Sequence, residues 1–361
     1  MSDALDNLAR EQPDETPARP SASPRQKWQL AIITAVALGL YLFMRLLPTG
    51  TNLNHMDFRL TDKNAIEFCD PANPQFIPVI AVRSPVALTL KSETPPEYKK
   101  ETRFTLKMRT AGGKAIGPAD LLVSHTQKLH LLIVDPTLSD YQHIHPVPGR
   151  WNGEWEFAFK PERPGVYRVF ADFTPVATQR GLYAAVDFEV PGEVANVIQT
   201  VYTTTQINNL NFELVTPGRF RAGVSADLTL RIQSAGAEKK PVPLQPVMGA
   251  FAHVVAFDEQ RSGFAHLHPQ QTDLSQPPDL LKPELNFKVL IPQAGRYAIW
   301  AQVKLAEEEI FVPFWVDVLP GGKDDDSPSL PSEKSSEPGD KGKGGLDRSV
   351  TAIPTSRPLA G

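Results

Sequence analysis

The sequence has a single cysteine, Cys69, among its 361 residues. One cysteine cannot close a disulfide within the chain, so no disulfide framework holds the fold. A blue-copper electron-transfer site needs a cysteine beside its histidines, and Cys69 lies well before the histidine-rich part of the chain. Two roles remain open for Cys69: a small buried apolar residue or an exposed thiol.

The sequence also lacks an excess of basic charge. Lys and Arg number 37 against 41 Asp and Glu, a net charge of −4, so there is no basic footprint and no nucleic-acid partner is expected. No segment after residue 79 shows a convincing apolar stripe of helical period. Proline is abundant instead, with 35 residues, about twice its ordinary share of roughly 5 %. This abundance indicates edges, turns and tails in place of long helices.

Long hydrophobic runs are absent except for one, Trp28–Leu47, which carries no charge over Leu30–Met44. A membrane-spanning helix needs about 20 mostly apolar residues. Arg25 and Lys27 precede the run and favour an N-terminus inside the cell, a bias that Arg45 weakens. We expect an uncleaved signal-anchor that crosses the membrane once. A cleaved signal peptide is the alternative, disfavoured by the long leader and the lack of a small-residue cleavage pattern.

Composition divides the rest of the chain. Both termini are polar and rich in Pro, Ser and mixed charge, which cannot bury enough apolar surface to fold. The expected organisation is a disordered cytoplasmic tail (1–27), a transmembrane helix (28–47), a lead-in segment (48–78), two repeated modules (79–192 and 196–320) and a disordered C-terminal tail (321–361).

The central region contains one pattern twice. "TLKMRTAGGK" begins at Thr105 and "TLRIQSAGAE" begins at Thr229, 124 residues later. The hexapeptide "YQHIHP" recurs as "FAHLHP" 123 residues later. A repeat of about 125 residues is too long for a solenoid unit and has the size of a domain. We therefore infer that one whole module has been duplicated.

Each module has the pattern of short strands. "EWEFAFKP" and "ELNFKVLIP" alternate apolar and polar residues, which is typical of half-buried strands. Turn signals such as "RPG" and "QAG" separate such segments. The fold class expected is all-β: two tandem immunoglobulin-like antiparallel β-sandwich domains after an N-terminal transmembrane helix. Tyr167 and Tyr297 occupy the place of an immunoglobulin tyrosine corner, or else are ordinary core aromatics.

The histidine pairs are expected on the returning strand of a hairpin. In module one "LHLLIV" (Leu129–Val134) is a strand, "DPTLSDY" a turn and "QHIHP" the returning strand. Residues two apart on a strand face the same way, so His143 and His145 share a face. If opposed positions sum to about 275, His130 lies across from His145 and diagonal to His143. The pattern recurs in module two, which predicts two converging triplets: His130, His143 and His145; and His253, His266 and His268.

Three neutral imidazoles suit Zn²⁺, Cu²⁺ or Ni²⁺. Two further candidate ligands are His125, five residues before His130, and its counterpart Met248, whose thioether suits Cu(I). The alternative is that the histidines are packing residues at strand ends, with a spacing inherited from the duplication.

Acidic side chains are less favoured as metal ligands. Asp135, Asp140 and Asp172 fit turn and surface positions. Asp172 is replaced by Gln302 in the second copy, which weakens its case further. His55 stands alone after the hydrophobic run, and no role is assigned to it.

The hairpins resemble a known group of bacterial proteins. "LHLLIVDPTLSDYQHIHP" and "AHVVAFDEQRSGFAHLHP" are similar to segments of secreted proteins of the YtkA-like and CopC-like type, which are immunoglobulin-like modules tied to copper handling. The resemblance covers residues 86–190 and 210–320 loosely and the hairpins well. It implies copper, with zinc as the alternative, and modules on the periplasmic side of a bacterial cytoplasmic membrane. CopC-type copper(II) sites also use a histidine at the mature N-terminus, which this chain does not match.

Three functions follow as hypotheses. The first is a membrane-anchored metal-binding protein that acts as carrier, buffer or sensor, in a place that suits another envelope protein as partner. The second is a structural or interaction protein of two sandwiches. The third, a zinc enzyme, is disfavoured because no paired general acid and base and no nucleophile motif are present. We expect a protein that is not an enzyme.

Overall fold

The computed structural model describes residues 23–46, 53–58, 75–197 and 199–322. Every helix and strand named below belongs to one unit of the chain, which ends at Gly321. Several predictions fall outside the described residues: the predicted tails over 1–22 and 323–361, the lead-in segment over 59–74, and Cys69 within it.

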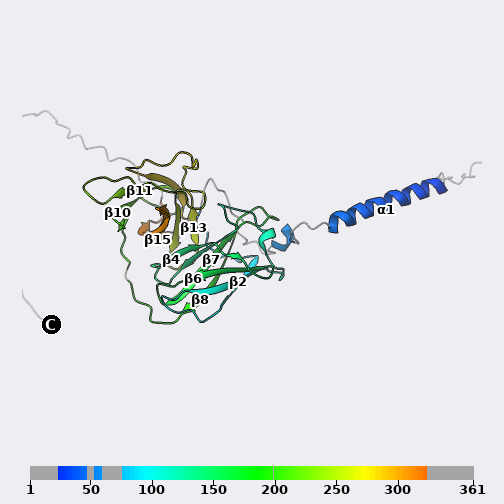
Figure 1. Cartoon of the computed structure of the whole chain (residues 1–361), viewed down its shortest axis with the longest axis horizontal. Coiled ribbons are helices and arrows are strands. Elements are labelled where there is room, and N and C mark those ends of the chain that lie inside the picture. The colour runs from blue at the N-terminus through cyan, green and yellow to red at the C-terminus, as the bar shows by residue number, and fades with distance from the viewer. Residues whose placement is uncertain (1–22, 47–52, 59–74, 198, 323–361) are drawn as a thin grey trace, which may run out of the picture. The chain divides into compact units, whose positions relative to one another are not determined.

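The helix α1 (Pro24–Leu46) begins with a capping box (Figure 1). The Ser23 N–H donates to Gln26 Oε1 (2.9 Å), and the Gln26 N–H donates to Ser23 Oγ (3.3 Å). Pro24 takes the first helical position, where its missing N–H costs nothing. The helix therefore starts four residues before the predicted boundary at residue 28, because the cap and the proline decide its start.

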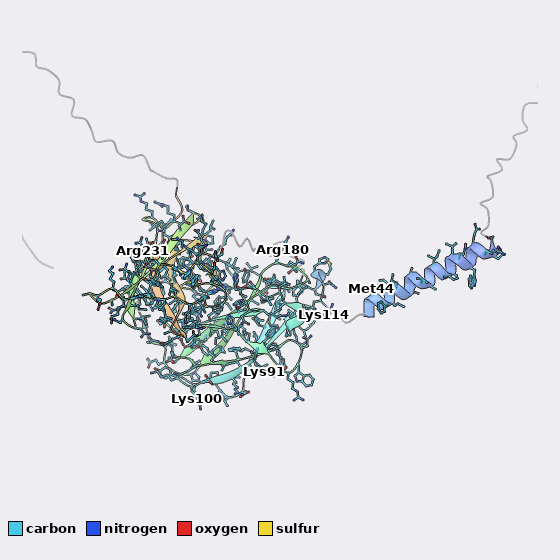
Figure 2. The ribbon with its side chains drawn as sticks, turned by 45° about the horizontal axis from the view of Figure 1, so that its top comes forward. Met44, Lys91, Lys100, Lys114, Arg180 and Arg231 are labelled. Carbon is cyan, nitrogen blue, oxygen red and sulfur yellow. The ribbon has the colours of Figure 1, made fainter. Side chains whose placement is uncertain are left out.

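The apolar part of α1 has the length and composition of a membrane-crossing helix. An 18-residue window within Pro24–Met44 has a mean hydropathy of 1.5, and none of that window is buried against the protein. Met44, labelled in Figure 2, is one of its many exposed apolar side chains. These properties fit either a membrane anchor or a signal sequence.

Module 1 is an antiparallel β-sandwich of two four-stranded sheets, as the alternating patterns predicted. The outer sheet, ordered β1-β2-β6-β5, consists of β1 (Val86–Ser92), β2 (Thr102–Thr110), β5 (Val147–Pro148) and β6 (Glu154–Phe159). The inner sheet, ordered β4-β3-β7-β8, consists of β3 (Leu129–Val134), β4 (Tyr141–Ile144), β7 (Gly165–Phe173) and β8 (Leu182–Val190). Two short 3₁₀ helices, η1 (His55–Phe58) and η2 (Pro118–Asp120), accompany it.

Module 2 repeats this architecture. Its outer sheet, ordered β14-β11-β10-β9, consists of β9 (Thr204–Ile207), β10 (Leu210–Val215), β11 (Ser225–Ser234) and β14 (Glu284–Leu290). Its inner sheet, ordered β13-β12-β15-β16, consists of β12 (His253–Asp258), β13 (Phe264–Leu267), β15 (Gly295–Leu305) and β16 (Glu308–Val318). Hairpin β12–β13 is the counterpart of hairpin β3–β4, as the 123-residue offset requires.

Alternating burial explains how each sandwich closes. Along β6, Trp155, Phe157 and Phe159 are buried and the intervening residues are more exposed. They meet inner-sheet side chains such as Leu131 and Ile133 in the core of module 1. Basic side chains such as Lys91, Lys100 and Lys114, labelled in Figure 2, lie exposed on the same module.

Tyr167 and Tyr297 both form a tyrosine corner. The Tyr167 hydroxyl accepts the backbone N–H of Arg163 (3.0 Å), and the Tyr297 hydroxyl donates to the carbonyl of Gln293 (3.0 Å), four residues upstream in each case. A tyrosine hydroxyl bonded to the backbone a few residues upstream is the feature that defines an immunoglobulin-like tyrosine corner. Of the two alternatives, a tyrosine corner or an ordinary core aromatic, the structure therefore supports the tyrosine corner.

A third hydrophobic core joins the two modules. It contains inner-sheet side chains from both, and they correspond in pairs. Leu132 corresponds to Val255, and Tyr141 to Phe264, at the 123-residue offset. In Figure 1, β4 and β7 of module 1 lie beside β13 of module 2, in agreement with this packing. The inner sheets are therefore covered on both faces, which explains why every residue of β3 and of β12 is buried.

Candidate metal centre

The hairpins place the histidines in the predicted register. In β3–β4, Leu132 lies opposite His143, and Leu131 opposite Ile144. The same register puts His130 across from His145. In β12–β13, Val255 lies opposite His266, which is the equivalent pairing. Each hairpin thus brings three imidazoles onto the face that points to the other module.

The first centre consists of His130, His143 and His145, and two of its ring nitrogens approach His130 Nδ1. His130 Nδ1 lies 3.1 Å from His143 Nε2 and 3.1 Å from His145 Nε2. On its far side, His130 Nε2 lies 3.0 Å from the carbonyl oxygen of Ser124. His143 Nδ1 lies 3.0 Å from Oε1 of Gln302, a side chain of module 2.

These outer partners fix where the hydrogens are. A carbonyl oxygen only accepts, so His130 carries its hydrogen on Nε2 and leaves Nδ1 bare. Gln302 donates its amide N–H to Glu309 (2.6 Å), so its oxygen faces His143, whose hydrogen is on Nδ1. His130 Nδ1 and His143 Nε2 therefore face each other at 3.1 Å with no hydrogen between them.

The second centre repeats this arrangement. His253 Nε2 donates to the carbonyl of Val247 (3.0 Å), and its Nδ1 lies 3.3 Å from His266 Nε2. His266 Nδ1 lies 3.2 Å from the Asp172 carboxylate of module 1. His268 Nε2 is buried without a hydrogen-bond partner among the described residues, a condition that normally costs about 1–3 kcal/mol.

Burial keeps these rings neutral. It lowers the pKa of His145 to about 4 and that of His253 to about 3. It also holds the pKa values of His143 and His266 well below the ordinary value, with neighbouring histidines as a further cause. Near neutral pH no imidazolium is available to supply the hydrogen missing between the facing nitrogens. The bare nitrogens are therefore free to bind another cation.

The spacing suits a metal ion. A metal–nitrogen bond of about 2.0–2.1 Å with bond angles between right-angled and tetrahedral puts ligand nitrogens about 2.9–3.4 Å apart. The facing nitrogens, at 3.1 and 3.3 Å, fall in that range. Within each triad the candidate ligand atoms all lie within 4.8 Å of one another. Each triad could therefore hold a metal ion.

The two triads adjoin each other. The His143 and His266 ring centroids are 5.2 Å apart, and those of His130 and His266 are 5.8 Å apart. Only the register within each hairpin was predicted; the meeting of the hairpins was not. The result is one cluster of histidines shared by both modules.

His125, a candidate ligand for the first centre, lies beside a histidine of the second centre. It opens a two-residue turn closed by paired bonds between Ser124 and Gln127, and its φ of 47° is left-handed. Its ring stacks on His268 of the other module, with centroids 3.5 Å apart, but lies 6.5 Å from His130. His125 thus adjoins the second centre instead of completing the first.

Met248 occupies the equivalent turn in module 2, with a φ of 51°. Its turn is closed by paired backbone bonds between Val247 and Ala250. The two turns approach each other, because a Cβ at Gly249 would lie 3.4 Å from the Thr126 methyl group. Binding of a metal by His125 or Met248 stays a prediction.

Comparison with known families assigns the chain. The family described as Domain of unknown function (DUF8832) matches residues 82–192 and again residues 205–319. The chain belongs to the DUF8832 family. One DUF8832 domain contains the strands of module 1, and the other contains those of module 2 except the first residue of β9. The family shown is thus DUF8832; the YtkA-like or CopC-like resemblance is not what the match shows.

Solved structures give only distant likenesses. A trypsin-activated alpha-2-macroglobulin of Escherichia coli is 15 % identical, with 65 % of this chain and 18 % of that one covered, at a TM-score of 0.22. A Corynebacterium diphtheriae protein described as membrane anchored is 8 % identical (66 % and 59 % covered, TM-score 0.22). A DUF4785 family protein of Legionella pneumophila is 9 % identical (64 % and 56 %, TM-score 0.21). The chain spans less than two thirds of each, and no curated protein matches it.

The prediction that Asp172 is a turn or surface residue was wrong. Asp172 lies beside His130 in the sheet of the first DUF8832 domain, and Gln302 holds the same place beside His253 in the second. Each reaches a histidine of the other domain. The replacement of Asp by Gln counted against Asp172 in the sequence, yet both side chains can accept a hydrogen from an imidazole. Their shared position beside a histidine was the available signal.

Asp135 and Asp140 are turn residues, as predicted, although both are buried. The Asp135 carboxylate accepts the backbone N–H groups of Ser139 and Asp140 (2.7 and 2.8 Å). Asp140 accepts the Tyr167 hydroxyl (2.6 Å). These bonds close the β3–β4 turn and so support the register of the histidines.

Proposed function

We propose that the protein binds two metal ions outside the cytoplasm, one in each three-histidine centre, with copper favoured and zinc as the alternative. The observation that carries the proposal is the facing of bare ring nitrogens, His130 Nδ1 with His143 Nε2 and His253 Nδ1 with His266 Nε2. Two lone pairs at that distance repel each other unless a cation lies between them.

The ligand set supports copper. Each centre offers neutral imidazoles, which bind Zn²⁺ and Cu²⁺ alike, and for a given set of nitrogen ligands Cu²⁺ binds more tightly than Zn²⁺. His145 and His268 are only partly buried, which leaves an approach for an incoming ion. Because the ligands are held by outer hydrogen bonds before any metal arrives, little ordering is needed on binding.

We further propose a role in carrying, buffering or sensing the metal, and not in catalysis. The helix α1 would anchor the modules to a bacterial cytoplasmic membrane from the periplasmic side, beside another envelope protein. Support comes from its length and exposed apolar surface and from the basic residues Arg25 and Lys27 at its start.

The test is a metal count on the full chain purified in detergent, stripped with a chelator and dialysed against Cu²⁺ or Zn²⁺. We expect two equivalents per chain. His143→Ala and His266→Ala should each lose one equivalent. His55→Ala is the matched control, because His55 is exposed in η1 and belongs to neither triad, and it should retain both.

The structural alternative predicts a different result. If the histidines only pack, the stripped protein binds no metal at micromolar concentration, while His143→Ala still lowers thermal stability by about 1–3 kcal/mol through the unpaired Gln302 oxygen. Unchanged metal content in a variant that lacks all six triad histidines would likewise rule out these centres.

A further inference from the structure

The two centres differ at one point. In each, the middle histidine of the triad is held by a side chain from the other module: His266 by Asp172, and His143 by Gln302. Asp172 and Gln302 occupy equivalent positions, paired with His130 on β3 and with His253 on β12. The geometry is thus the same in both centres, but the charge is not.

The surroundings of these two acceptors strengthen the difference. Asp172 places a carboxylate directly on His266 Nδ1, and its side chain is only 20 % exposed. Gln302 is buried and neutral, and the Glu309 carboxylate accepts a hydrogen bond from its amide nitrogen (2.6 Å), on the side away from His143. In the second centre the carboxylate of Asp172 bonds a histidine of the triad directly. In the first centre the carboxylate of Glu309 is separated from His143 by the side chain of Gln302.

A carboxylate hydrogen-bonded to a histidine ligand raises the basicity of that ligand and offsets the charge of the ion. Loss of such a partner typically lowers metal affinity by about 10–100-fold. Little solvent reaches this interface, so the carboxylate charge is only weakly screened.

We propose that the two centres are unequal: the second, in module 2, binds a divalent ion more tightly and fills first, with Asp172 as the positioning residue that makes it so. This inference rests on the proposed function. It also makes the second centre depend on module 1, since its charge-bearing partner comes from there.

The experiment separates the centres with single-centre variants of the full chain. His145→Ala leaves the second centre intact, and His268→Ala leaves the first. Affinity for Cu²⁺ is measured by competition with a chelator of known affinity. We expect the His145→Ala protein to bind at least about 10-fold more tightly than the His268→Ala protein.

Asp172→Asn keeps the size and a hydrogen-bond acceptor but removes the charge. In the His145→Ala background it should weaken binding by about 10–100-fold, and in the His268→Ala background by less than about twofold. Asp172→Glu, which keeps the charge, should retain most of the affinity in the first of these backgrounds. Asp227→Asn is the charge control, because Asp227 is exposed on β11 of the outer sheet.

A gain of affinity tests the same reasoning without loss of structure. The double variant Gln302→Glu with Glu309→Gln moves a carboxylate onto His143 at unchanged net charge and keeps the bond between the two side chains. In the His268→Ala background it should tighten binding by about 10-fold. A purely structural role of these positions predicts no gain.

The outcomes distinguish the two claims. Equal affinities of the two single-centre variants, or equal weakening of both by Asp172→Asn, would overturn the inference while the proposed function stands. Absence of bound metal in the unaltered protein would overturn the proposed function and the inference with it.

Discussion

Acid should destabilise the metal-free protein through its buried histidines. In the unfolded chain a histidine has a pKa near 6.5, whereas burial lowers the pKa of His253 to about 3 and that of His145 to about 4. Between those values and pH 6.5 the unfolded state binds more protons than the folded state. Stability is therefore full above about pH 6.5 and falls as the pH drops through that window.

The size of the loss can be worked out for pH 5. Each pKa unit corresponds to about 1.4 kcal/mol, so the 1.5 units between pH 5 and the unfolded pKa cost about 2 kcal/mol at His253. His145 is partly exposed and screened by water, so its share is about 1 kcal/mol. Together they remove about 3 kcal/mol, a large part of the roughly 5–15 kcal/mol that stabilises a typical domain.

The assay is urea unfolding of the chelator-stripped protein at pH 7.5 and pH 5.0, followed by tryptophan fluorescence. Trp300 and Trp315 are suitable probes because both lie in the core between the modules. His253→Gln, which retains a donor for the Val247 carbonyl, should reduce the pH effect by about 2 kcal/mol, and His55→Ala should not change it. Stability at pH 5.0 within about 0.5 kcal/mol of that at pH 7.5 would refute the reasoning.

Three further outcomes are expected. Metal at 100 times the dissociation constant of one centre should add about 2.7 kcal/mol of stability from that centre in thermal unfolding; no shift would mean that the folded state has no preference for the ion. Tyr167→Phe should lower the free energy of unfolding in urea by about 1–3 kcal/mol, because the buried Asp140 carboxylate loses the hydroxyl that donates to it at 2.6 Å. Tyr297→Phe loses a single bond to the carbonyl of Gln293 and should cost about 1 kcal/mol. Phe257→Ala, in the core between the modules, should cost about 3–5 kcal/mol and lower the metal content of both centres; loss from one centre alone would show that the interface does not support both.

The sequence sufficed for the hairpins, and the reason is local. Alternation of side chains along a strand and a constant sum of opposed positions place His130, His143 and His145 together once the turn is located. Both rules act within about 20 residues of chain, and the turn is held by Asp135 and Asp140 as short polar side chains hold turns elsewhere.

The meeting of the two triads depends on packing between modules, which has no such local rule. The sequence did contain one signal that these strands are covered on both faces. "LHLLIV" and "HVVAFD" are apolar on both faces apart from their histidines and a final aspartate, whereas a strand with one face in water alternates apolar and polar residues. Every residue of both strands is buried. The helix α1 extends beyond the start of the apolar run for a different reason, because Ser23 and Gln26 act through capping, which hydrophobicity alone does not reveal.

The reciprocal contacts between the modules are those of a twofold-symmetric dimer built into one chain. In a dimer of identical subunits, a change at the position of Asp172 would appear on both sides of the axis at once. A covalent tandem has no such constraint, because each half is encoded separately. The pairs Asp172 and Gln302, and His125 and Met248, are differences that no homodimer could carry. Duplication thus gave the molecule two similar histidine triads whose chemistry can be adjusted one at a time.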